Sequence, residues 1–182
     1  MTTNIKTVGV IGAGQMGGGI AQVAAVAGFK VLVYDSFAGA LGRCQDSHTK
    51  RLAREVEKAK EAEREASTKG DAAAASKARH RVESASAAPT RIHYEPNLDM
   101  LKGSDVVIEA VVEDVKVKRP LFAKLAEMFP GNQILATNTS SISITEIAAA
   151  AEAAHKGAGE RVIGMHFFNP VPVMKLVEII RS

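Results

Sequence analysis

The chain has 182 residues, of which 46% are hydrophobic and 4% aromatic, with no Trp and a formal net charge of +3. This length fits one domain, and the small charge and few aromatic rings argue against a surface that binds nucleic acid. No apolar run is long enough to span a membrane, and the single cysteine, Cys44, excludes an internal disulfide, so we expect a cytoplasmic protein that is not bound to a membrane.

The first predicted unit is a strand, a glycine-rich turn and a helix. An apolar run over residues 7–11 is followed by Gly-Ala-Gly-Gln-Met-Gly and then by a helix-forming segment. Gly12 permits a tight turn, Gly14 lets the backbone approach a pyrophosphate, and Gly17 lets the helix pack close to the strand. The phosphates would lie at the helix N-terminus, where backbone N–H groups are free. This pattern predicts a dinucleotide site.

The second predicted strand, over residues 30–34, ends at an acid. This acid is Asp35, eighteen residues after Gly17. An acid at this position accepts hydrogen bonds from the adenosine ribose and repels a 2′-phosphate, so it favours NAD over NADP. The alternative is a glycine turn that binds nothing, with Asp35 as a helix N-cap. Because strand, helix and acid occur together, we favour the cofactor site.

A charged helical segment occupies about residues 42–88. Gly70 and Asp71 divide it into two helices, with Gly70 at the end of the first and Asp71 as the N-cap of the second. Helices that are polar on nearly every side cannot be buried, so we expect a hairpin that protrudes from the body. Its Lys and Arg side chains are either ordinary solvated charges or a face that meets the phosphates of a ligand.

After Pro89 the chain alternates again between strands and helices. We predict strands at 91–94, 105–109, 133–137 and 162–165, and helices at 98–102, 117–129 and 143–154, the last opened by a Ser143–Glu146 capping box. This alternation is typical of a doubly wound, mostly parallel α/β sheet, in which ligands bind at the carboxyl ends of the strands. Asp35, Glu113, residues 138–141 and His166 fall there, and we expect them to form one site.

The C-terminal segment places a histidine and a carboxylate in two separate apolar runs. His166 ends the first run, and Glu178 lies inside the second, over residues 175–180. Pro170 and Pro172 favour a reversal between them, which would let Glu178 reach His166. A carboxylate among apolar residues is costly to bury unless it is paired. We therefore predict an imidazole oriented by a buried acid, the arrangement of a general base near neutral pH.

Four segments carry a resemblance to a known family. They are Gly-Ala-Gly-Gln-Met-Gly (12–17), Val-Ile-Glu-Ala-Val-Val-Glu-Asp (107–114), Asn-Thr-Ser-Ser (138–141) and His-Phe-Phe-Asn-Pro-Val-Pro-Val-Met-Lys-Leu-Val-Glu (166–178). Together they resemble the L-3-hydroxyacyl-CoA dehydrogenases, above all the bacterial 3-hydroxybutyryl-CoA dehydrogenases. The resemblance implies a Rossmann-like NAD-binding domain over residues 1–182, and an enzyme that uses NAD to oxidise the 3-hydroxyl of an acyl-CoA or catalyses the reverse reduction.

The same resemblance implies roles at the substrate. His166 would take the hydroxyl proton, and Glu178 would orient the imidazole and stabilise its cation. Ser140 and Asn169 would hydrogen-bond the substrate oxygen, and Lys58 of the hairpin would help to hold CoA. Without the resemblance, Asn169 before a proline would be only a turn residue. Ser140 lies at the carboxyl edge of the sheet, which favours a place in the site over a simple strand end.

At the cofactor, the resemblance implies contacts from Gln15 and Met16 of the glycine loop and from Glu113 and Lys118. Lys118 is alternatively an ordinary solvated helix residue, and Glu109 is either a second acid of the site or a strand-end acid exposed to water. No Cys/His cluster has metal-ligand spacing, so no metal is expected. The remaining histidines lie in polar or helical surroundings, and we expect all of them on the surface: His48, His80, His93 and His155.

The family's second, helical domain has no counterpart in this sequence. This is either a truncated N-terminal domain or a natural short form, and we favour the first, with homo-oligomer contacts in the full-length form. Two functions are compatible with these features. One is the catalytic domain of an NAD-dependent 3-hydroxyacyl-CoA dehydrogenase, weakly active or inactive alone, and the other is an NAD(H)-binding module without turnover. Only the catalytic domain requires His166 and Glu178. The absence of the second domain is the reason to retain the NAD(H)-binding module as an alternative.

Overall fold

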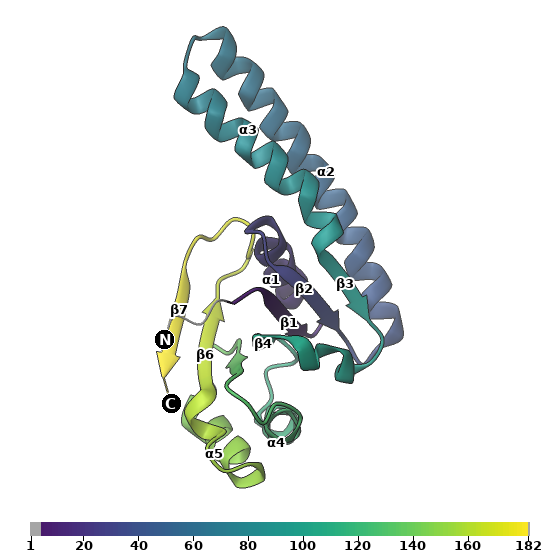
Figure 1. Cartoon of the computed structure of the whole chain (residues 1–182), viewed down its shortest axis with the longest axis vertical. Coiled ribbons are helices and arrows are strands. Elements are labelled where there is room, and N and C mark those ends of the chain that lie inside the picture. Colours follow the sequence, from purple (N-terminus) through teal and green to yellow (C-terminus); the bar gives the residue numbers. More distant parts are fainter. Residues whose placement is uncertain (1–4, 182) are drawn as a thin grey trace.

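A single sheet organises the computed structural model, which describes residues 5–181 (Figure 1). The sheet has seven strands in the order β3-β2-β1-β4-β5-β6-β7, and all neighbours pair in parallel except β6 and β7. The predicted doubly wound, mostly parallel α/β fold is confirmed. The strands are β1 (Thr7–Ile11), β2 (Lys30–Tyr34), β3 (Ile92–Glu95), β4 (Val106–Glu109), β5 (Ile134–Thr137), β6 (Val162–Phe167) and β7 (Val177–Arg181).

Helices cover both faces of this sheet because successive strand residues point to opposite sides. On β4, Val106 and Ile108 belong to the core on one face, with α1 (Gln15–Val26) and the start of α2 (Ala38–Thr68). Val107 between them faces the other core, with α4 (Val115–Met128) and α5 (Ile144–Ala154). Short 3₁₀ turns complete the connections: Ala88–Arg91, Leu98–Gly103 and Gly159–Arg161. The strand order reverses between β1 and β4, which is where such sheets bind ligands.

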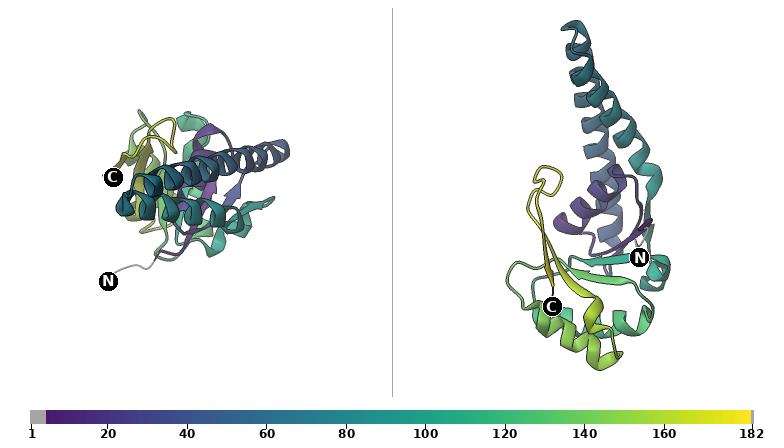
Figure 2. Two further views of the ribbon diagram at one scale, coloured as in Figure 1. Left: turned by 90° about the horizontal axis from the view of Figure 1, so that it is seen from above. Right: turned by 60° about the vertical axis from the view of Figure 1, so that its left-hand side comes forward.

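The helical hairpin consists of α2 and α3 (Ala72–Ala87), and it extends well beyond the sheet (Figures 1 and 2). Gly70 has a φ of +72°, and the Asp71 carboxylate accepts a hydrogen bond from the Ala74 N–H at 2.9 Å, as predicted for the stop and restart. The two helices pack through small residues, which lets them approach closely: Ala59, Ala66, Ala75, Ala78 and Ala85 are all buried.

Two local predictions need correction. The first hairpin helix begins at Ala38 rather than near residue 42, because its first turns pack on the body before it projects. Ser143 is the N-cap residue of α5, but its side chain makes no capping hydrogen bond. Glu146 instead lies 3.4 Å from Arg119 of α4, so the predicted capping box does not form.

His48 is buried, contrary to the prediction that it lies on the surface. It is 3% exposed, and its Nε2 lies 2.7 Å from the Gly18 carbonyl oxygen while its Nδ1 lies 2.6 Å from the Tyr94 hydroxyl. Burial lowers the pKa of the His48 imidazole. Cys44, His48 and Leu52 recur every four residues on α2 and all face the body. This spacing in the sequence indicates a helix face that packs on the body, which is the signal for the burial of His48. His80 and His93 are exposed, as expected.

Candidate cofactor and catalytic site

The glycine loop fits a dinucleotide. Gly12 has a φ of +102°, and a Cβ atom there would lie 2.6 Å from the Ala110 carbonyl oxygen. A Cβ atom at Gly17 would lie 1.8 Å from the Gly12 carbonyl oxygen, so only glycine allows α1 to pack this closely on the turn. A Cβ atom at Gly14 would meet nothing within 4 Å, and no described side chain caps α1. The helix N-terminus therefore offers its N–H groups to a phosphate.

Asp35 stands beside this loop at the end of β2. Its Oδ2 accepts a hydrogen bond from the Ala13 N–H at 2.7 Å, and its Oδ1 accepts one from the Phe37 N–H at 2.8 Å. The N-cap residue of α2 is Phe37, so the alternative role of Asp35 as that N-cap does not apply. A cavity of about 440 Å³ runs along the loop, between Asp35 and an apolar wall formed by Val111, Val112 and Val117. A groove with a carboxylate at one side suits a nucleoside.

His166 and Glu178 face each other across the β6–β7 ladder. They occupy opposed positions of the two antiparallel strands, and His166 Nδ1 lies 2.8 Å from Glu178 Oε2. A carboxylate accepts hydrogen bonds, so Nδ1 carries a proton, and in the neutral imidazole Nε2 then has the free lone pair. The reversal through the proline-containing segment that was predicted from the sequence is therefore observed. The Phe168 ring lies against the imidazole, with 4.5 Å between the ring centroids.

The burial predicted for Glu178 is wrong. Its side chain is 51% exposed, whereas that of His166 is 21% exposed. The neighbours that suggested a buried run, Ile179 and Ile180, are themselves 56% and 44% exposed. The reason is that β7 lies at the edge of the sheet, where four of its five residues are exposed.

Glu113 holds the loop that follows β5. Its Oε1 accepts hydrogen bonds from the Thr139 hydroxyl and from the Ser140 N–H, the latter at 3.0 Å. The Ser141 hydroxyl lies 3.4 Å from the same oxygen. Burial alone would raise the pKa of the Glu113 carboxyl, but these hydrogen bonds and the Lys118 ammonium outweigh it and hold the pKa below its ordinary value. Glu113 is therefore a carboxylate that fixes the position of Ser140.

A buried ion pair lies behind this loop. Lys118 and Glu109 have no exposed side-chain surface, and Lys118 Nζ lies 2.8 Å and 2.9 Å from the two Glu109 oxygens. Neither the exposed strand-end acid considered for Glu109 nor the solvated helix residue considered for Lys118 is correct. Glu109 is the one charged residue in an otherwise apolar segment, Val-Val-Ile-Glu-Ala-Val-Val, over residues 106–112. A carboxylate within an apolar segment therefore indicates burial correctly at Glu109, whereas the same pattern gave a wrong prediction at Glu178.

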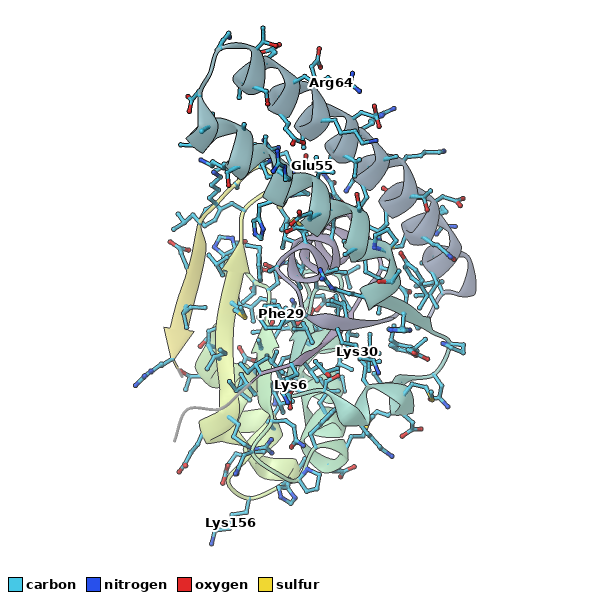
Figure 3. All side chains as sticks on the ribbon, turned by 45° about the horizontal axis from the view of Figure 1, so that its top comes forward. Lys6, Phe29, Lys30, Glu55, Arg64 and Lys156 are labelled. Carbon is cyan, nitrogen blue, oxygen red and sulfur yellow. The ribbon has the colours of Figure 1, made fainter. Side chains whose placement is uncertain are left out.

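A second cavity, of about 310 Å³, lies between residues of the hairpin and residues of the β6–β7 loop. Its wall on α2 carries three exposed cations, Arg51, Arg54 and Lys58. The acid between them, Glu55, is bound by Arg81 of α3 at 2.5 Å. Glu55 lies partway along the hairpin and Arg64 nearer its tip (Figure 3). The cavity wall is therefore cationic, which suits an anionic ligand.

Gln15 and Asn169 meet at one end of this second cavity. The Gln15 side-chain N–H₂ donates to Asn169 Oδ1 at 2.9 Å, which joins a residue predicted for the cofactor to one predicted for the substrate. Within residues 5–181, no hydrogen bond joins Ser140, Lys58 or Met16 to the His166–Glu178 pair. In the same range, no group of three or more His, Cys, Asp or Glu side chains could hold a metal ion, and no helix is long and apolar enough to cross a membrane.

Comparisons with known proteins agree with this geometry. The family model described as "3-hydroxyacyl-CoA dehydrogenase, NAD binding domain" matches residues 7–182. The 3-hydroxybutyryl-CoA dehydrogenase of Bradyrhizobium diazoefficiens is 45% identical over 182 residues, which are 100% of this chain and 54% of that protein. The 3-hydroxyadipyl-CoA dehydrogenase of Escherichia coli is 44% identical over 180 residues, 99% of this chain and 33% of that protein.

A solved structure gives the same result. The crystal structure of (S)-3-hydroxybutyryl-CoA dehydrogenase from Ralstonia eutropha matches with a TM-score of 0.77 and 37% sequence identity, over 98% of this chain and 55% of that one. The chain therefore spans between a third and about half of the length of these relatives.

Proposed function

Because this chain belongs to the 3-hydroxyacyl-CoA dehydrogenase family, we propose that it carries the NAD site and the general base of an enzyme that oxidises L-3-hydroxyacyl-CoA to 3-ketoacyl-CoA. The reverse reduction, for example of acetoacetyl-CoA, would use the same residues. The observation that carries the proposal is the His166–Glu178 pair, 2.8 Å apart, on a sheet whose first turn is a dinucleotide loop. NAD is the cofactor, and when bound it accepts the hydride from the substrate.

His166 is proposed as the base. Its Nδ1–H donates to Glu178, so Nε2 is the nitrogen that takes the proton from the 3-hydroxyl. The imidazole then becomes a cation, and the Glu178 carboxylate 2.8 Å away stabilises it while holding the ring orientation. In the reduction the same proton returns to the ketone oxygen. A positioned base of this kind contributes about 10²- to 10⁴-fold in rate.

Ser140 and Asn169 are proposed to hydrogen-bond the substrate oxygen. The backbone N–H of Ser140 is fixed by Glu113, and the serine side chain is exposed. Asn169 uses its Oδ1 to accept from Gln15, so its N–H₂ group remains as a donor. In this proposal the Ser140 hydroxyl and the Asn169 N–H₂ group both donate to the substrate oxygen. Because negative charge develops on that oxygen in the transition state, these donors lower the barrier more than they tighten ground-state binding.

The cofactor contacts are proposed to be the glycine loop and its surroundings. Asp35 accepts from the ribose and selects NAD over NADP, as its place beside the glycine loop supports. Glu113, which is hydrogen-bonded to the loop that follows β5, is proposed as a further cofactor contact. Lys118 has no exposed side-chain surface, and we propose that it serves the cofactor by holding Glu113, 3.3 Å away. The remaining contacts are proposed for the loop itself: Gly12, Gly14, Gln15 and Met16 line the cavity. Gly17 belongs to this set because it lets α1 pack closely on the turn.

Coenzyme A is proposed to occupy the second cavity. Arg51, Arg54 and Lys58 line it from the hairpin, and Asn169 lines it from the β6–β7 loop. Coenzyme A carries phosphates at one end and the reacting acyl group at the other. The cations suit the phosphates, and Asn169 follows His166 by three residues. Residues 1–182 are proposed as one NAD-binding domain with the hairpin as its insertion.

The test is NADH oxidation by the purified chain with acetoacetyl-CoA as acceptor. We expect turnover by the wild-type chain and a loss of about 100-fold or more in His166→Gln, with NADH affinity unchanged within about twofold. His93→Gln, which alters an exposed histidine of β3, is the matched control and should behave as wild type. A large loss of NADH affinity in His166→Gln would contradict the role of His166 as base. NADH binding without turnover would instead favour an NAD(H)-binding module, a role compatible with a chain that spans only part of its relatives.

A further inference from the structure

We infer that Glu109 is a positioning residue for the cofactor side of this site and that it acts through Lys118 and Glu113. The inference rests on the proposed function, because Glu113 is the proposed cofactor contact. Glu109 itself has no exposed side-chain surface, so no ligand can touch its carboxylate. Any effect of Glu109 on a ligand must therefore pass through the groups that surround it.

The Glu109 carboxylate is saturated by its neighbours. Oε1 accepts from Lys118 Nζ at 2.8 Å and from the Val111 N–H at 2.7 Å. Oε2 accepts from Lys118 Nζ at 2.9 Å and from the Thr137 hydroxyl at 2.6 Å. One side chain thus ties together the end of β4, the end of β5 and the first turns of α4, three elements that meet at the carboxyl edge of the sheet.

Lys118 carries this constraint forward to the loop. Its ammonium also lies 3.1 Å from the Asn138 carbonyl oxygen and 3.3 Å from Glu113 Oε2. With one Glu113 oxygen held by Lys118, the other is turned to Thr139 and Ser140. Lys118 therefore constrains the loop of residues 138–141 at two points: directly at the Asn138 carbonyl oxygen and, through Glu113, at Thr139 and Ser140.

The constraint reaches the strand of the base as well. Asn138, whose carbonyl oxygen contacts Lys118, uses its side-chain Oδ1 to accept from the Phe167 N–H at 2.9 Å. Phe167 is the residue next to His166 on β6. The chain of contacts from Glu109 thus ends both at Ser140 and beside the imidazole.

A positioning role explains why this pair is charged. Two ions lose their hydration when they are fully buried, and their attraction often does no more than offset that loss. Apolar side chains of similar size would fill the same space at no electrostatic cost. An ion pair differs from them in having directional contacts, and the Lys118 ammonium uses these contacts to orient Glu113 and Asn138.

The experiment compares the binding of NADH with that of ADP, which is the adenosine diphosphate half of NADH. On the proposed site, NADH would contact both the glycine loop and the Glu113 side, whereas ADP would contact only the glycine loop and Asp35. We expect Glu109→Gln to weaken NADH binding about tenfold or more and to leave ADP binding within about twofold of wild type. Fluorescence titration gives the NADH affinity, and displacement or calorimetry gives that of ADP. Intact ADP binding also shows that the variant is folded.

Two further variants keep the test decisive. Thr137→Val removes one hydrogen bond to Glu109 but keeps the ion pair, and it should weaken NADH binding about two- to fivefold with no change for ADP. Asp105→Asn is the matched control, because Asp105 precedes β4 at the opposite end and accepts from the N–H groups of Lys6 and Thr7. It should lower the melting temperature and leave both affinities unchanged.

A double variant tests whether Glu109 acts through Lys118. In a Lys118→Met background, adding Glu109→Gln should change NADH affinity by less than about twofold. Equal losses of NADH and ADP affinity in both Glu109→Gln and Thr137→Val, or no loss of either, would overturn the inference. Failure of the proposed function shows itself differently, because then the wild-type chain would bind NADH without oxidising it in the presence of acetoacetyl-CoA.

Discussion

His48 should be a main anchor of the hairpin, and its removal gives a prediction that can be worked out in energy. His48→Ala removes a buried hydrogen bond to Gly18 at 2.7 Å and a partly buried one to Tyr94 at 2.6 Å, each worth about 1 kcal/mol. It also leaves the partly buried Tyr94 hydroxyl without its partner, which costs about 1 kcal/mol more. We expect a loss of about 3 kcal/mol, which for a chain of this size lowers the melting temperature by roughly 6–12 °C.

The measurement is thermal unfolding followed by circular dichroism at pH 7.5. His80→Ala is the matched control, because His80 is exposed on α3 of the same hairpin and its loss should cost no more than about 0.5 kcal/mol. If His48→Ala melted within about 2 °C of wild type, the two hydrogen bonds would contribute nothing net and the reasoning would be refuted.

The same residue predicts a dependence on pH. Burial, partly opposed by the hydrogen bond to Gly18, lowers the pKa of His48 in the folded chain below 6.5. Below pH 6.5 the unfolded chain therefore binds more protons at this site than the folded chain, and stability falls as the pH is lowered. The fall ends once the pH drops below the folded pKa. His48→Gln should lack this part of the acid destabilisation, and parallel curves for the two proteins between pH 7.5 and 5 would contradict the assignment.

Three further predictions concern the site and the thiol. Glu178→Gln should lower kcat for acetoacetyl-CoA about fivefold, far less than His166→Gln, because an amide can still orient the imidazole and the half-exposed charge is screened by water; an effect as large as that of His166→Gln would refute this ranking. Asp35→Asn should weaken NADH binding about tenfold and improve NADPH binding, measured by titration of each, since the charge that repels a 2′-phosphate is gone. Cys44 should react with a thiol reagent at pH 8 only after unfolding, because burial raises its pKa to about 11; rapid reaction of the folded chain would contradict this.

Much of this site follows from local patterns in the sequence. The glycine loop, Asp35 and the reversal that joins Glu178 to His166 each depend on residues close in the chain or on a strand and turn that adjoin. These local patterns can be predicted because single residues, such as Gly12 and Gly17, determine the backbone geometry at their positions.

Burial was the property that the sequence could not decide. Glu109 and Glu178 both sit in apolar runs, yet one is fully buried and the other half exposed. The difference arises because β4 lies inside the sheet and β7 at its edge, which depends on strand order and not on the run itself. The Lys118–Glu109–Thr137 cluster also escaped prediction, since Thr137 is 28 residues from Glu109 and only the pairing of β4 with β5 brings them together.

The place of β7 at the sheet edge also bears on the timing of the proposed catalysis. Within the described residues β7 pairs only with β6, so opening these few ladder bonds would carry Glu178 away from His166 while the rest of the fold stays intact. Local opening of an edge strand requires much less free energy than global unfolding. The fraction of molecules in which the proposed base is oriented would then be set by the fraying of one strand. Amide hydrogen exchange at residues 177–181 would report that fraction, and any contact that clamps β7 would raise the rate without touching the substrate.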